Sequence, residues 1–229
     1  MKKKYFIIAA VLLCVMPLSM VNAQRTAGTF SFSGFGSMGM PIGPEDFKTY
    51  WKTSFGFGGG LKYNLSRMLS FSASYTYQPF KPDFDELLDI FGPSFELQWP
   101  GVDIELDGMN VNFSIISANL IQYFSHPGAS AGFYLTAGGS YYIYTVSDLE
   151  FTGSGLGVTV DETWDLSNEG DDGFGINGGV GFEIELASNM SLFIEALYNY
   201  LFIDMGEVDG EGEDKISFIT AKAGILINL

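Results

Sequence analysis

The sequence predicts an all-β chain that folds as an eight-stranded antiparallel up-and-down transmembrane β-barrel. Eight segments alternate between apolar and polar residues, and most have ten or more residues. A tilted membrane strand needs about 9–11 residues, whereas strands of soluble proteins usually have about five or six. The connections alternate between short and long, and the acidic residues gather in the long ones. Together these three observations favour a barrel in a membrane.

The composition excludes several classes of protein. With a net charge of −16 and a pI near 4.2, the chain lacks the basic face on which most nucleic-acid-binding proteins rely. A hydrophobic content of 47% argues against disorder. One Cys and one His argue against a disulfide scaffold and most His-based metal sites. We therefore expect no nucleic-acid partner and no cofactor.

The N-terminus has the pattern of an export signal. Basic residues at 2–4 precede an apolar run over 5–16, and Val21-Asn22-Ala23 fits the small-x-small rule before a cleavage site. The sequence thus predicts a signal peptide over 1–23 and a barrel domain over 24–229.

Two other interpretations of this N-terminus are weaker. An uncleaved membrane anchor would need about 20 apolar residues, and the run stops at Pro17. Lipidation at Cys14 is disfavoured because Leu13 is a poor residue before a lipidated Cys and the apolar run continues past it.

The strands follow from alternation with a period of two. In one example, Leu69, Phe71 and Ala73 alternate with Ser70 and Ser72. Near the middle of the chain the apolar parity changes between residues 115 and 121, which predicts a β-bulge. The predicted strands span about 28–40, 51–64, 69–79, 109–124, 131–147, 173–186, 191–204 and 215–229.

The connections predict the orientation of the barrel. Bacterial outer-membrane barrels have short periplasmic turns and longer outer loops. All but three of the 27 acidic residues lie in the long connections or at their flanks, and the exceptions are Glu183, Glu185 and Glu195. The predicted short turns are 65–68, 125–130 and 187–190, and the predicted outer loops are 41–50, 80–108, 148–172 and 205–214.

Alternation alone does not tell which face of the strands lies inside. A soluble sandwich or a lipocalin would turn the apolar face inward. Strand length, the order of the connections, the segregated charge and the terminal strand favour a membrane barrel. In that terminal strand Ile225, Ile227 and Leu229 share one parity.

The terminal strand is similar to the C-terminal signature of outer-membrane proteins, although that signature usually ends on an aromatic residue and this chain ends on Leu229. Residues 28–229 as a whole resemble the small eight-stranded outer-membrane barrels of the OmpX, OmpA-transmembrane and OmpW type. The resemblance implies a monomeric cell-envelope protein with a porin-like barrel. This barrel would lie in the bacterial outer membrane and contact its lipid.

Aromatic residues near the strand ends fit interface girdles of a membrane barrel. The alternative is that they form the core of a soluble barrel. The expected loop-end girdle comprises Tyr50, Trp51, Tyr75, Tyr77, Tyr144, Tyr198 and Tyr200. The expected turn-end girdle comprises Tyr63, Phe71, Tyr123, Phe133 and Phe182.

Five charged residues on the polar face of the strands form the candidate site: Lys62, Glu183, Glu185, Glu195 and Lys222. An eight-stranded barrel is just wide enough for side chains to fill it, and buried charges must be paired. We therefore expect a luminal plug of paired charges. If the last short turn centres on residue 189, Glu183 faces Glu195 across the hairpin. The alternative is a carboxylate pair that does acid–base chemistry.

Neither catalysis nor metal binding is strongly indicated. The only histidine, His126, falls in a predicted periplasmic turn, whereas outer-membrane lipases, acyltransferases and proteases of the barrel type generally use a histidine near the outer rim. We therefore expect no catalytic residues and no enzyme activity. One outer loop carries carboxylates that could hold Ca²⁺ or Mg²⁺, although a solvated acidic tip is favoured. These metal candidates are Glu207, Asp209, Glu211 and Glu213.

The second and third outer loops carry further alternation. It predicts one hairpin of 95–99 with 102–106 and another of 146–151 with 158–164, both above the membrane. Exposed strand edges can recruit another strand, and barrels of the OmpX type likewise carry a protruding sheet. We expect extracellular protein partners to bind through these loops.

The sequence therefore predicts an outer-membrane β-barrel with surface-exposed acidic loops that supports the membrane, binds external partners, or both. The alternative is a narrow channel for small hydrophobic molecules, as the OmpW resemblance implies. A lumen blocked by charges favours the first function, and a continuous apolar path from the loops into the wall favours the second.

Overall fold

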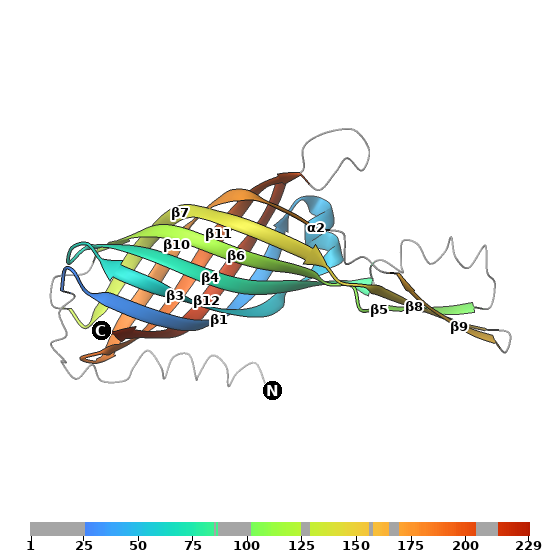
Figure 1. Ribbon diagram of the computed structural model, residues 1–229, viewed down its shortest axis with the longest axis horizontal. Helices are drawn as coiled ribbons and strands as arrows, with labels where there is room; N and C mark the ends of the chain where they lie inside the picture. The colour runs from blue at the N-terminus through green and yellow to red at the C-terminus, as the bar shows by residue number, and fades with distance from the viewer. Residues whose placement is uncertain are drawn as a thin grey trace, which may run out of the picture.

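The computed structural model describes residues 26–84, 86, 102–124, 129–155, 158–164, 170–204 and 215–229 (Figure 1). The predicted signal peptide lies outside these residues. No helix in the described part is long and apolar enough to cross a membrane.

Eight long strands form the body of the fold. They are β1 (Phe30–Gly43), β3 (Ser54–Asn64), β4 (Leu69–Pro82), β6 (Val111–Tyr123), β7 (Ala131–Val146), β10 (Gly170–Ala187), β11 (Met190–Asp204) and β12 (Lys215–Asn228). The remaining elements are the short helix α2 (Glu45–Tyr50) and the strands β2 (Trp51–Lys52), β5 (Val102–Asp107), β8 (Leu149–Gly155) and β9 (Val158–Trp164). All eight predicted strands are present.

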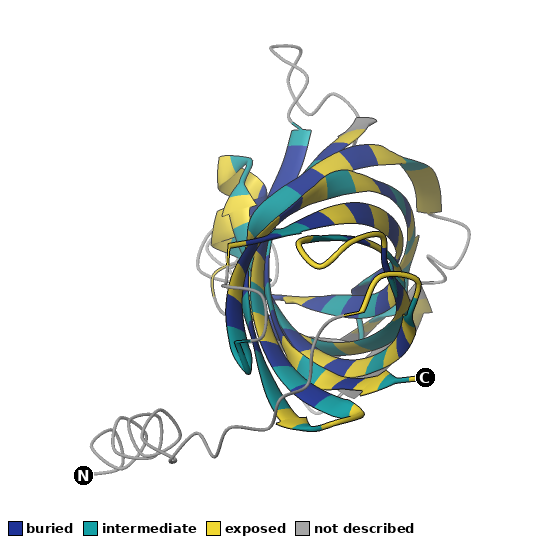
Figure 2. Ribbon diagram, turned by 90° about the vertical axis from the view of Figure 1, so that its left-hand side faces the viewer, coloured by how far each residue is buried: buried dark blue, intermediate teal, exposed yellow. Residues whose placement is uncertain are grey.

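The long strands close into a barrel. Their order around the wall is β4-β3-β1-β12-β11-β10-β7-β6, and β6 pairs with β4 to complete the circle. Every pairing is antiparallel. The first and last long strands meet at the seam, where Leu229 donates its backbone N–H to the carbonyl of Phe30 at 2.9 Å. The predicted antiparallel barrel is confirmed (Figure 2).

The bulge predicted near the middle of the chain is absent. Strand β6 pairs in unbroken register with β4 from Val111 to Gln122 and with β7 from Val111 to Tyr123. The parity of the sequence is blurred because β6 has apolar residues on both faces: Phe113 and Ile115 are buried inside, and Ile116 is exposed outside. The lumen is apolar at one end of β6 and polar farther along it. The alternation in the sequence therefore seems to change parity, although the register of the strand does not shift.

Burial alternates along each long strand, as the banding of the ribbon in Figure 2 shows. The apolar residues of the sequence pattern lie on the outside. Five of them, Phe71, Leu135, Val180, Ile194 and Ala223, are exposed. An outward apolar face of this kind suits a wall that contacts a membrane.

The inside of the barrel has two chemically different halves. The half near α2 is an apolar core of buried residues, which are Phe47, Phe80, Val111, Phe113, Ile115, Tyr142, Leu201, Ile216 and Phe218. Helix α2 inserts Phe47 into this core. The centroid of the Phe47 ring lies 5.3 Å from the centroid of the Phe80 ring. The opposite half, toward the short turns, holds the charged residues described below.

Part of the predicted girdle assignment is wrong. Tyr123 is buried inside the barrel, and Tyr144 and Trp51 pack against the apolar core. Tyr123 and Tyr144 have the parity of inward residues on their strands, and Trp51 lies beside Phe47 of α2 with ring centroids 6.1 Å apart. Proximity to a strand end does not by itself place an aromatic side chain at the membrane interface.

The short turns have simple local causes. Within residues 65–68, the Ser66 hydroxyl accepts hydrogen bonds from the backbone N–H of Met68 and Leu69. Side-chain caps of this type stabilise tight turns. The turn between β10 and β11 consists of Ser188 and Asn189. Both turns lie at the end of the barrel that holds the C-terminus (Figure 1).

A separate three-stranded sheet extends beyond the opposite end of the barrel (Figure 1). Its strand order is β5-β8-β9, with both pairings antiparallel. The predicted pairing of 146–151 with 158–164 corresponds to the pairing of β8 with β9. In the other predicted hairpin, 95–99 lies outside the described residues, and 102–106 lies in β5, which pairs with β8.

The outward parity of β10 leads to a first prediction. Changing Val180 to Arg should lower the free energy of unfolding by about 2–4 kcal/mol, because a charge near the middle of the lipid-facing wall loses its hydration. Ile227 is also exposed on the outer face but lies at the turn end of β12. Ile227→Arg should cost about 0–1 kcal/mol, since charges near the interface keep water.

Urea unfolding in lipid vesicles measures both values. Equal costs for the two variants would mean that the wall is not embedded at the depth of Val180.

Candidate functional site: paired charges inside the barrel

The candidate site is a set of charged and phenolic side chains in the half of the lumen near the short turns. Lys62 comes from β3, Glu183 from β10, Glu195 from β11 and Lys222 from β12. All four have the inward parity of their strands. Each carries its charge in a space that the wall encloses, where an unpaired charge is costly.

The first ion pair joins opposite sides of the wall. The ammonium of Lys62 lies 2.8 Å from Oε2 of Glu183, and both side chains are about 5% exposed or less. The Tyr123 hydroxyl donates to the same carboxylate oxygen at 2.7 Å. Lys62 also lies 3.2 Å from the Tyr123 hydroxyl oxygen, which accepts from the ammonium. Glu183 is therefore held by two donors, both short enough for charge-assisted hydrogen bonds.

The second ion pair is looser. Glu195 and Lys222 are cross-strand partners on β11 and β12, with 3.9 Å between Lys222 Nζ and Glu195 Oε1. The Tyr134 hydroxyl donates to Oε2 of Glu195 at 3.1 Å. The ammonium of Lys222 lies 4.9 Å from the centroid of the Phe35 ring, within the range of a cation–π contact.

The two ion pairs are neighbours. The rings of Tyr123 and Tyr134, one from each pair, lie 5.2 Å apart between their centroids. Both pairs also line the same internal cavity, which has a volume of only about 50 Å³. The site is therefore one cluster with two carboxylate–ammonium–tyrosine groups.

The predicted opposition of Glu183 and Glu195 is wrong. Glu183 pairs with Phe193, and Glu195 pairs with Gly181. The turn is one residue closer to the N-terminus than expected, and the ladder has an irregularity between Glu185 and Ala187. This register moves the two like charges apart, which removes the repulsion of a directly opposed pair.

Glu185 shares the predicted inward parity but lies closer to the barrel end than the two ion pairs. It is half-buried, and its Cα partner across the hairpin is Ser191. The structure therefore brings four of the five predicted residues into two pairs and places the fifth beside them at the rim.

Above the charges, uncharged polar side chains form a middle layer. Ser37 donates to Gln78, which donates in turn to the carbonyl and the hydroxyl of Ser54. On β11, Asn199 donates to the Thr220 hydroxyl at 2.9 Å and to the Phe218 carbonyl at 3.3 Å.

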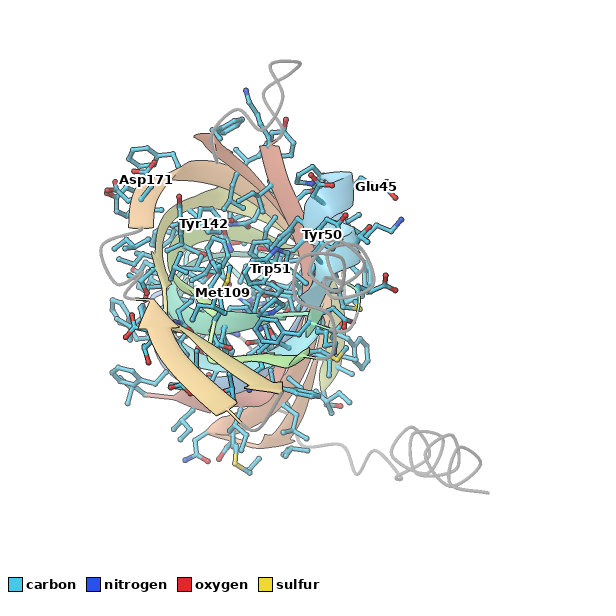
Figure 3. All side chains as sticks on the ribbon, turned by 90° about the vertical axis from the view of Figure 1, so that its right-hand side faces the viewer. Glu45, Tyr50, Trp51, Met109, Tyr142 and Asp171 are labelled. Atoms are coloured by element: carbon cyan, nitrogen blue, oxygen red, sulfur yellow. The ribbon has the colours of Figure 1, made fainter. Side chains whose placement is uncertain are left out.

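The apolar core follows at the loop end. Viewed from that end, side chains fill the ring of strands around Trp51, Met109 and Tyr142 (Figure 3). Side chains thus occupy the lumen at the loop end, in the middle and at the turn end.

This arrangement suits a structural role better than acid–base chemistry. Both carboxylates already engage an ammonium and a tyrosine, and the cavity that the two ion pairs share has a volume of about 50 Å³. Among the described residues, no group of three or more His, Cys, Asp or Glu is placed to hold a metal ion. His126 and the metal candidates Glu207, Asp209, Glu211 and Glu213 lie outside the described residues.

Sequence reasoning missed both tyrosines of the site. Tyr123 has the same parity as the inward residues Ser117 and Asn119 on β6, so extending that parity would have placed it inside. Tyr134 alternates with the lipid-facing Phe133 and Leu135, but nothing in the sequence indicates that it reaches Glu195 on another strand.

Comparisons with known proteins give similarity at the level of fold. No protein-family model matches the chain, and no curated protein matches it. Several solved structures are similar. One is the outer membrane protein OprG from Pseudomonas aeruginosa, with 11% identity over 91% of this chain and 99% of that chain and a TM-score of 0.48.

Two further structures are Neisserial surface protein A and the attachment invasion locus protein Ail of Yersinia pestis. The first has 14% identity, covers 86% of this chain and 96% of that chain, and has a TM-score of 0.46. The second has 14% identity, covers 88% of this chain and 100% of that chain, and has a TM-score of 0.41. These are outer-membrane barrels, the class of protein that the sequence resembles.

The ion pair of Lys62 and Glu183 leads to a second prediction. Lys62→Met or Glu183→Gln alone should cost about 3–5 kcal/mol, because each leaves a buried partner uncompensated. The double variant should cost less than the sum of the two, with a coupling of about 0.5–3 kcal/mol. Urea unfolding in vesicles of both singles and the double measures this coupling.

The pair Lys52–Asp83 is a control of nearly the same separation, 2.9 Å, in which Lys52 is exposed and Asp83 is half-buried. Its coupling should be below about 1 kcal/mol because water reaches the ammonium of Lys52 and screens the pair. Additive effects at Lys62 and Glu183, or a coupling no larger than in the control, would contradict the plug.

The position of Tyr134 leads to a third prediction. A Cβ atom on Gly181 would overlap the Tyr134 ring, so Gly181→Ala should displace the ring from Glu195 and cost about 1–3 kcal/mol. For the same reason Gly181 leaves no room for a larger side chain. Gly178→Ala on the same strand adds only an ordinary contact and is the matched control.

Urea unfolding of the two alanine variants distinguishes them. If Gly181→Ala is as stable as Gly178→Ala, the ring of Tyr134 does not lie over Gly181.

Proposed function

We propose that this chain is a bacterial outer-membrane protein that strengthens the membrane as a closed barrel and meets external partners through its acidic loops and projecting sheet. The apolar outer face supports a membrane location, because the exposed side chains of the wall include Phe57, Leu135 and Ile194. Closure of the sheet supports it too, since a barrel leaves no unpaired edge in lipid.

The observation that carries this proposal is the filled lumen. Apolar side chains occupy the loop end, hydrogen-bonded polar side chains the middle, and two ion pairs the turn end. A cavity of about 50 Å³ has room for a few water molecules and no larger solute. With the interior occupied, the surfaces available for function are the membrane-facing wall and the loops.

The orientation follows from the lengths of the connections. In outer-membrane barrels the short turns face the periplasm, which places α2 and the β5-β8-β9 sheet outside the cell. In this proposal the protein is not an enzyme, because both luminal carboxylates serve in ion pairs.

A fourth prediction tests this orientation. Asp171 near the loop end and Asn189 in the short turn are both exposed. In intact cells, an impermeant thiol reagent should label Asp171→Cys and leave Asn189→Cys unlabelled. The parent chain gives the background, and permeabilised cells should label both variants. Labelling of Asn189→Cys alone in intact cells would reverse the proposed orientation.

A second candidate function, passage of small hydrophobic molecules, is favoured by one feature of the wall. The ladder between β3 and β4 runs from Asn64 and Ser70 to Phe57 and Tyr77 and then stops. Pairing resumes only at Lys52, on β2. Strand β4 has Pro79 in this interval, and proline has no backbone N–H to donate.

Side chains bridge the interruption instead of backbone pairs. Gln78 donates to Ser54, and the Ser54 hydroxyl donates to the Pro79 carbonyl. The neighbouring Phe80 belongs to the apolar core. An apolar molecule that displaced these side chains would pass between the core and the lipid without entering the charged half of the lumen.

Uptake of a small apolar fluorescent dye by intact cells tests this second function. Cells that produce the protein should take up the dye faster than cells that lack it, and Gln78→Ala should raise the rate further by removing the bridge. Asn199→Ala is the control, because Asn199 is a buried polar residue that keeps its cross-strand partner, Phe218, in the β11–β12 ladder. Equal uptake with and without the protein would exclude this function.

A further inference from the structure

A short segment at the loop end is held over the apolar core mainly by one side chain. The segment, residues 44–53, links β1 to β3 and contains α2 and β2. Of the six residues of α2, all of which the structure describes, only Phe47 is buried, and its ring inserts into the core. Viewed from the loop end, Trp51 lies near the centre of the barrel mouth and Glu45 near its edge (Figure 3).

Helix α2 depends on this buried side chain for its conformation. Isolated helices shorter than about 12–15 residues are marginal in water, so a helix of six residues needs packing against the rest of the fold. Four residues of α2 are exposed and supply little of that packing: Glu45, Asp46, Lys48 and Thr49. If Phe47 left the core, the helix would lose its main support.

The two ends of the segment join the barrel through short stretches of pairing. At the first end, the ladder of β1 and β12 shifts register before its last pair, Gly43 with Ser217. At the second end, β2 pairs with β4 through two residues, Trp51 and Lys52, and this ladder is separate from the longer ladder of β3 with β4. Segments with few buried contacts open most readily, and hinges are commonly residues at the ends of elements.

Strand β2 is coupled to the helix. The ring centroids of Trp51 and Phe47 lie 6.1 Å apart, and Trp51 packs against the same core. Asp83 holds this end closed, because its backbone N–H donates to the Tyr50 carbonyl at 2.6 Å and its carboxylate lies 2.9 Å from the ammonium of Lys52. Since the two rings pack side by side, we expect α2 and β2 to leave the core together.

We propose that α2 and β2 form a lid over the apolar core, that Phe47 holds this lid shut, and that its opening exposes the core at the loop end. Opening alone brings apolar surface into water, so the closed form predominates. A small apolar molecule that takes the place of the Phe47 ring stabilises the open form, because it binds only there. This inference rests on the second candidate function, since it supplies the entry that apolar molecules would need.

Tryptic cleavage of the full chain, folded into detergent micelles, measures the opening of the lid. Lys48 and Lys52 lie in the lid, and a protease cuts such a segment at a rate that follows the population of the open form. Phe47→Ala should speed cleavage after both residues about ten- to hundredfold, because the buried ring no longer holds the lid. Phe47→Leu keeps an apolar side chain and should speed it less. Cleavage after Arg67, in a short turn at the other end of the barrel, should not change.

Two further variants separate lid opening from general destabilisation. Phe193→Ala removes a buried ring from the turn-end half of the lumen and should leave cleavage after Lys48 nearly unchanged. Lys52 and Lys81 are directly opposite on β2 and β4, so cysteines at both positions can form a disulfide. With Lys52→Cys and Lys81→Cys, oxidation should slow cleavage after Lys48 severalfold, and a reducing agent should restore the faster rate. The reduced form is the matched control, because it lacks the same two lysines.

A heat-modifiability gel checks that each variant is folded, and if Phe47→Ala is not, Phe47→Leu and the disulfide variant decide. Equal acceleration by Phe47→Ala and Phe193→Ala, or unchanged cleavage in both Phe47 variants, would overturn the role of Phe47. Equal cleavage of the oxidised and reduced disulfide variant would overturn the opening at β2. Dye uptake by cells tests the second candidate function separately: a lid that opens without dye uptake would remove that function and leave the lid.

Discussion

The pairing of β1 with β12 is the constraint on which the other features depend. These strands come from opposite ends of the described chain, and their ladder runs from Ser31 and Asn228 to Pro41 and Phe218 before a shift near Gly43. In lipid, each unpaired backbone group costs several kcal/mol, so a β-sheet is viable only when it closes. Once the sheet closes, each strand has one set of alternate residues that points into the lumen and another set that points outward.

Closure with eight strands also determines what the lumen can contain. The enclosed space is just wide enough for side chains, so each inward residue needs a partner from another strand. At the loop end, Phe80, Phe113 and Phe218 fill this space, with ring centroids 5.4–5.9 Å apart. At the turn end Lys62 meets Glu183, although β3 and β10 are not neighbours in the wall. The packing that excludes solutes is thus the packing that holds opposite walls together.

Most of the fold and part of the candidate site could be predicted from the sequence. Alternation located all eight strands, because lipid outside and a packed lumen inside impose a period of two on each. It did not indicate that the lumen is apolar at one end, and for that reason the parity of β6 seemed to shift near Ile115. The five inward charges were identified from parity, but the register of β10 with β11 was not, because it depends on a turn of only Ser188 and Asn189.

The tyrosines show a second limit of the sequence. Tyr123 and Tyr134 approach Glu183 and Glu195 from strands that are not adjacent in the chain to those that carry the carboxylates. Contacts across the lumen depend on strand tilt and side-chain length, and neither has a local sequence pattern. Gly181 belongs to the same class of feature: its lack of a side chain is explained only when the Tyr134 ring is seen to cover it.

Conductance across a planar lipid bilayer is the most direct test of the central claim that the barrel is closed along its axis. We predict that the purified, folded protein inserts without producing conductance steps above those of the bare bilayer, while a porin in the same bilayer produces them. Insertion is verified by recovering the heat-modifiable protein from the membrane. Reproducible ion-conducting steps from the wild-type chain would show an open aqueous path and contradict the account of a lumen filled by the apolar core and the two ion pairs.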